Sequence, residues 1–191
     1  RFCQAKQFEA TFGGGEANIR QLVAGLNLIR KTLGCPVTTL LEEEEHTHPQ
    51  MPQLCKLVGI RYASLAQLDT WGRAGCPKMD VNAIHWKGLD GTTILTSTKT
   101  GLFHIGPQTD QSLAENADFK KLSAAGKPLL LQWEEFGWES QEHPRYLDAP
   151  KEYGQLSKAE FVTLTEYLEK YGAQAAPEPH YLAMDDWDKS L

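Results

Sequence analysis

The chain has 191 residues and a formal net charge of −6 at pH 7, and 41% of its residues are hydrophobic. This length and composition are typical of a globular protein with one full core, so we expect one main domain. The negative charge, without a basic patch, argues against nucleic acids and anionic membranes as partners. No apolar run approaches the ~18 residues that span a bilayer.

The four cysteines are widely spaced and form no C-x-x-C pair, which argues against a zinc knuckle or a redox motif. The chain begins at Arg1 without Met and ends without a clear stop, so we expect a fragment. We expect a soluble protein. A secreted or periplasmic location stays open, because any targeting segment would lie outside this sequence.

The N-terminal part predicts strand, helix and strand in turn. Residues 8–12 alternate apolar and polar side chains, which predicts a short strand before a glycine turn. An amphipathic helix of about 17 residues follows and ends before Gly34 and Pro36. Its apolar face comprises Ile19, Leu22, Val23, Leu26, Ile29 and Leu33. Residues 37–41 then predict a second strand.

A short helix, a strand, a loop and a β-hairpin are predicted next. Residues 51–59 have a helical pattern, with Pro49 in the first turn. Residues 61–65 predict a strand, and residues 69–77 contain the turn-forming residues of a long loop. Two β-type runs then flank Leu89-Asp90-Gly91, which is a hairpin pattern.

The C-terminal half continues the alternation of helices and strands. Residues 110–125 predict a helix, and residues 129–133 form an apolar run that predicts a parallel strand covered on both faces. Residues 161–163 predict a last strand, and Thr163 and Glu166 have the spacing of a capping box. This alternation predicts βαβ units that form a parallel sheet or barrel.

Two groups of carboxylates follow two of the predicted strands: residues 42–45, and Glu134 and Glu135 with Glu139. The carboxyl ends of parallel strands share one edge, so both groups would face one cleft. Glycoside hydrolysis uses two carboxylates, one to protonate the leaving oxygen and one to act as nucleophile or to activate water. A solvated acidic loop is the alternative for each group.

Histidine and aromatic side chains accompany the acidic groups. His46 and His48 are two positions apart, so on an extended backbone both imidazoles could reach one cation. The alternative is one helix-capping and one exposed histidine. Tryptophans near these loops could stack on sugars, with core packing as the alternative. The predicted substrate-binding residues are Trp71, Arg73, Trp86 and Trp138.

Four segments together carry a resemblance to a known family. They are residues 15–22 (Gly-Glu-Ala-Asn-Ile-Arg-Gln-Leu), 48–54 (His-Pro-Gln-Met-Pro-Gln-Leu), 70–73 (Thr-Trp-Gly-Arg) and 86–92 (Trp-Lys-Gly-Leu-Asp-Gly-Thr). In this order and spacing they resemble the N-terminal barrel domain of glycoside hydrolase family 38, the α-mannosidases, and its bacterial relatives. The resemblance implies an incomplete (β/α) barrel of the seven-stranded type over residues 1–175, then a linker or the start of a missing segment at 176–191. It also implies a retaining mechanism and a zinc ion that holds substrate hydroxyls.

The resemblance assigns the nucleophile to Glu43. The family has an Asp-x-Phe-Gly stretch just before a Pro-Gln-Leu-Pro-Gln-like run, and counting back from Pro49 places that Asp on Glu43. Because the residue type has changed to Glu, the neighbouring Glu44 and Glu45 are alternatives. The second carboxylate group would supply the acid/base or a substrate contact.

Three functions are therefore open. The first is a retaining glycosidase of the α-mannosidase type, and the second is a non-catalytic barrel that binds carbohydrate. The second arises because the nucleophile stretch is altered and the family's His-x-Asp zinc motif has no counterpart in this chain. The third, by fold analogy alone, is a metal-dependent hydrolase or deacetylase with His46 and His48 as ligands.

Overall fold

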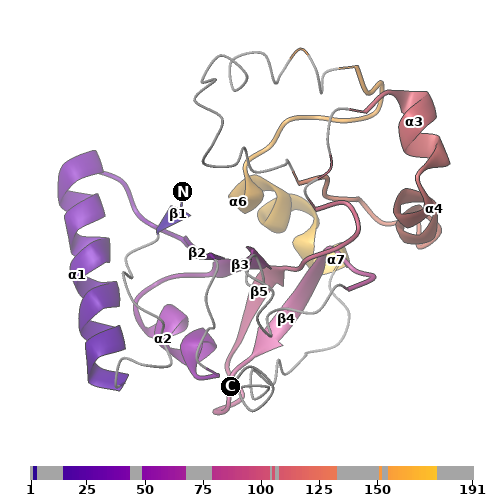
Figure 1. Ribbon diagram of the computed structural model, residues 1–191. Helices are drawn as coiled ribbons and strands as arrows, with labels where there is room; N and C mark the ends of the chain where they lie inside the picture. The colour runs from indigo at the N-terminus through magenta and orange to yellow at the C-terminus, as the bar shows by residue number, and fades with distance from the viewer. Residues whose placement is uncertain are drawn as a thin grey trace, which may run out of the picture.

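The computed structural model describes residues 2–3, 15–43, 49–67, 79–103, 105, 108–132, 151 and 155–175. At its centre lies a five-stranded sheet in the order β1-β2-β3-β5-β4 (Figure 1). The strands are β1 (Phe2–Cys3), β2 (Thr39–Glu43), β3 (Tyr62–Gln67), β4 (Ala83–Lys87) and β5 (Thr93–Ser97). Neighbouring strands are parallel throughout except for β4, which runs antiparallel to β5.

The prediction of a seven-stranded (β/α) barrel is wrong for the described residues. Their sheet is open, with β1 at one edge and β4 at the other. A (β/α) barrel closes by adding parallel strands, each followed by a helix. Here β4 leads into β5 through a hairpin instead, and β4 then occupies the edge on which a further parallel strand would have to pair.

The β4–β5 hairpin is confirmed, and its turn explains the reversal of the chain. The Asp90 carboxylate accepts hydrogen bonds from the Thr92 hydroxyl at 2.7 Å and from the Thr92 amide at 3.0 Å. These bonds hold the pKa of Asp90 below its usual value. Gly91 has a φ of 85°, a conformation that costs glycine little. Interactions among neighbouring residues therefore stabilise the turn that joins β4 to β5.

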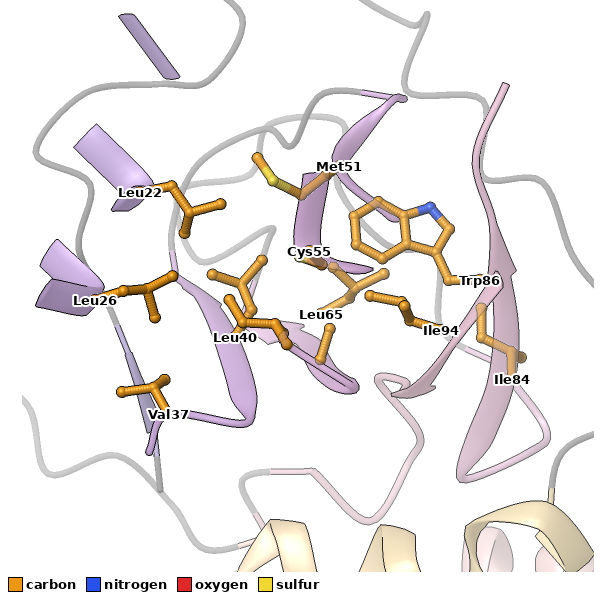
Figure 2. Close-up of a cluster of buried hydrophobic side chains, with 12 residues drawn as sticks. Leu22, Leu26, Val37, Leu40, Met51, Cys55, Leu65, Ile84, Trp86 and Ile94 are labelled. Atoms are coloured by element: carbon orange, nitrogen blue, oxygen red, sulfur yellow. The ribbon is translucent and has the colours of Figure 1, made fainter. Parts of the chain in front are cut away.

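Helices α1 (Gly15–Leu33) and α2 (Met51–Leu57) cover one face of the sheet and confirm the two N-terminal helix predictions. The side chains between them and the sheet form the main core (Figure 2). Its buried members are Leu22, Leu26, Val37, Leu40, Met51, Cys55, Ile60, Ala63, Leu65, Ile84, Trp86 and Ile94. None of the helices in the described ranges has both the length and the apolar character needed to cross a membrane.

A second helical layer covers the opposite face of the sheet. It consists of α6 (Leu164–Tyr167), the π-helix η1 (Leu168–Gly172) and α7 (Ala173–Ala175), which follow one another without a break. Successive strand residues face opposite sides: Ile94 belongs to the main core, whereas Leu95 packs with Tyr167. The sheet therefore lies between two helical layers.

Two close contacts dock this second layer on the sheet. The hydroxyls of Thr39 in β2 and Thr165 in α6 are hydrogen-bonded at 2.7 Å. Gly172 lies so near β5 that a Cβ atom at this position would be only 2.5 Å from Leu95 Cδ2. The absence of a side chain at residue 172 therefore allows the helix to approach the strand closely.

The start of α6 confirms one prediction and corrects another. Thr163 and Glu166 form a capping box: the Thr163 amide donates to Glu166 Oε2 at 2.7 Å, and the Glu166 amide donates to Thr163 Oγ1 at 3.2 Å. The strand predicted at residues 161–163 is wrong, because this stretch is exposed chain leading into the cap.

The helix predicted at residues 110–125 is two helices, α3 (Asp110–Glu115) and α4 (Ala117–Ser123). Asn116 separates them because its backbone is extended and its side chain accepts a hydrogen bond from the Phe119 amide at 2.9 Å. In Figure 1 both helices lie apart from α1, on the far side of the sheet. Each contributes one leucine, Leu113 and Leu122, to a smaller cluster that also contains Leu102, Ile105 and Leu156.

The strand predicted at residues 129–133 is also wrong over its described part, residues 129–132, which belongs to no strand. The apolar run has a different cause. Leu129 and Leu131 pack against the smaller cluster, whereas Leu130 packs with Tyr167 and its neighbours. The segment is thus covered on both sides, as the run of leucines indicated, without joining the sheet.

Candidate functional site

The carboxyl ends of the parallel strands β2, β3 and β5 lie side by side along one edge of the sheet, which is distinct from the outer edges formed by β1 and β4. Glu43 is the last residue of β2 and is paired in register with Gln67, the last residue of β3. Three residues earlier in β3, Ser64 pairs with Ser97, the last residue of β5. The first predicted acidic group therefore starts at this edge. For Glu43, the structure describes the backbone and not the side chain.

The register between β2 and β3 shifts between Leu41 and Glu43. Such a bulge changes the path of a strand and the direction of the next side chains, and bulges are frequent beside active sites. The irregularity lies directly before the residue predicted as the nucleophile. It therefore separates the regular, core-forming part of β2 from the segment predicted to carry the chemistry.

The segment that precedes the second acidic group docks near the same edge. Thr98 directly follows β5, and its carbonyl accepts a hydrogen bond from the Gln132 side-chain amide at 3.3 Å. Gln132 stands two residues before Glu134 in the sequence. Because β3 alone lies between β2 and β5, these two strands are about 10 Å apart. The chain segments leading to both acidic groups thus reach one edge.

Buried hydroxyl groups gather where β5 ends, a feature that the sequence analysis missed. Thr96, Ser97, Thr98 and Thr100 are all buried. The Thr98 hydroxyl donates to the Val81 carbonyl, and Thr100 Oγ1 accepts from the Leu102 amide at 3.1 Å. Among the described residues, Ser97 Oγ has no hydrogen-bond partner. The run of serine and threonine directly after an apolar strand was the available signal.

Trp86 is the one predicted substrate-binding residue whose side chain is described, and it lies in the core. It is 0% exposed and belongs to the same cluster as Met51 and Ile94 (Figure 2). Its Nε1 atom finds no hydrogen-bond partner in the part of the chain that the structure describes. This is the core-packing alternative, because a fully buried indole presents no face to a sugar.

The other predicted site residues lie outside the described ranges, so their roles stay predictions. They are Glu44, His46, His48, Trp71, Arg73, Glu134, Glu135 and Trp138. The described residues contain no group of three or more His, Cys, Asp or Glu side chains that could hold a metal ion. The described part of the chain therefore does not supply the zinc site that the resemblance implies.

Comparison with protein families matches residues 8–183 to the glycosyl hydrolases family 38 N-terminal domain. A match over most of the chain identifies the protein as a glycoside hydrolase family member. The chain belongs to glycoside hydrolase family 38 and corresponds to its N-terminal domain.

A solved structure of a family 38 glycosyl hydrolase from Enterococcus faecalis is similar to 95% of this chain, with 15% sequence identity and a TM-score of 0.48. The chain spans 19% of the length of that protein. No curated protein matches the sequence.

Proposed function

We propose that the protein hydrolyses α-mannosides with retention of configuration, with Glu43 as the nucleophile and Glu134 or Glu135 as the acid/base. Membership of family 38 supports glycoside hydrolysis. The observation that carries the assignment is the position of Glu43 at the carboxyl end of β2, where the chain leaves the sheet. The docking of Gln132 near the same edge supports the second carboxylate.

In the proposed reaction, a Glu43 carboxylate oxygen attacks the anomeric carbon while the bond to the leaving oxygen breaks. Glu134 or Glu135 gives its proton to that oxygen, and the sugar becomes an ester of Glu43. The same acid/base, now a carboxylate, takes a proton from water, which attacks the anomeric carbon and releases Glu43. Two inversions give net retention. A pair of carboxyl groups about 5–5.5 Å apart would fit this mechanism.

Glu43 is one methylene longer than the aspartate that the family resemblance leads us to expect. The bulge before Glu43 supports the assignment, because it allows the strand end to take a path different from a regular β2. Trp71, Arg73 and Trp138 are proposed to contact the sugar, and Trp86 is assigned to the core.

Zinc binding by His46 and His48 is a separate part of the proposal. When bound, such an ion would hold substrate hydroxyls near the nucleophile. Its test does not depend on turnover: the zinc content of the purified full-length protein is measured before and after His46→Ala and His48→Ala. Equal zinc content in wild type and both variants would contradict these ligands.

Hydrolysis of an aryl α-mannoside by the full-length protein tests the function. We expect turnover that Glu43→Gln abolishes, whereas Glu115→Gln, an exposed carboxylate on α3, leaves it unchanged. Azide should restore turnover to Glu43→Ala by occupying the space of the lost carboxylate, with a mannosyl azide of inverted configuration as product. Activity that survives Glu43→Gln but is lost in Glu44→Gln would move the nucleophile to Glu44.

A carbohydrate-binding protein without catalysis is the second candidate, favoured by the Glu residues that replace the family's Asp-x-Phe-Gly pattern. Binding of mannose measured by calorimetry, together with no turnover by the wild type, would support it.

A further inference from the structure

We draw no further inference here: the strongest candidate, the exposed apolar surface of α1 formed by Ile19, Val23 and Leu33 beside the outer edge of the sheet at β1, carries no proposal because nothing in the described part of the chain shows what covers it.

Discussion

Truncation of Trp86 distinguishes a core side chain from a sugar-stacking one. The indole is 0% exposed in the main core (Figure 2). A tryptophan side chain buries about 150–250 Å², and at about 25 cal/mol per Å² this corresponds to about 4–6 kcal/mol. Burying Nε1–H without a hydrogen-bond partner among the described residues destabilises the folded state. Removing this group therefore offsets part of the free energy lost with the indole. We therefore expect Trp86→Ala to lower the free energy of unfolding by about 3–5 kcal/mol.

Urea unfolding followed by circular dichroism measures this loss. With a denaturant slope of about 2 kcal/mol per molar urea, the midpoint should fall by about 1.5–2.5 M. Trp86→Phe keeps an aromatic ring without the unpartnered donor and should show a smaller loss, which protects the test if the alanine variant does not fold. Leu89→Ala, at a position 64% exposed in the hairpin turn, should change stability by no more than about 0.5 kcal/mol. An unchanged midpoint for Trp86→Ala, combined with weaker sugar binding, would refute the core assignment.

Two further predictions concern the second helical layer. Gly172→Ala should lower the free energy of unfolding by about 1–2 kcal/mol, because the new Cβ would be 2.5 Å from Leu95 Cδ2. Gly15→Ala is the control, because its Cβ would meet open space and should not lower stability. Equal melting temperatures for the two variants would contradict the close approach of Gly172 to Leu95. Glu160 accepts hydrogen bonds from Lys170 at 2.9 Å and Tyr171 at 3.0 Å, which hold its pKa below the ordinary 4.5. The ionised Glu160 carboxylate therefore stabilises the fold above pH 4.5, and this stabilisation is lost as the pH falls through the lowered pKa. The difference in melting temperature between wild type and Glu160→Gln should shrink below pH 4.5. An equal difference at pH 7 and pH 3 would contradict a stabilising role of the Glu160 carboxylate.

Elements that depend on neighbouring residues were predicted correctly from the sequence. The Asp90-Gly91 turn, the capping box of Thr163 and Glu166, and the amphipathic pattern of α1 each act over a few residues. The barrel prediction failed because sheet closure depends on pairing between distant strands. The hairpin pattern placed β4 next to β5, but no local pattern indicated that β5 would pair with β3 and leave β4 at the outer edge of the sheet.

The run of leucines at residues 129–131 shows a second limit. Its apolar character correctly indicated burial on both sides, but burial between two side-chain clusters and burial inside a sheet leave the same pattern. The hydrogen bonds that hold this segment come from Gln132 and Asn82, which are polar residues without a recognisable motif. The sequence thus predicted the acidic group after β2, whereas the residues that position the second segment emerged from the structure.

Trapping of the covalent sugar ester tests the central claim most directly. A retaining mannosidase whose deglycosylation is slowed by a fluorinated mannosyl fluoride accumulates the sugar on its nucleophile. Mass spectrometry of the digested full-length protein should find one sugar on the peptide that contains Glu43, with fragmentation placing it on that residue. A sugar located on any other residue, or no labelled peptide from a protein that turns over the substrate, would contradict the assignment of Glu43 as the nucleophile of this family 38 protein.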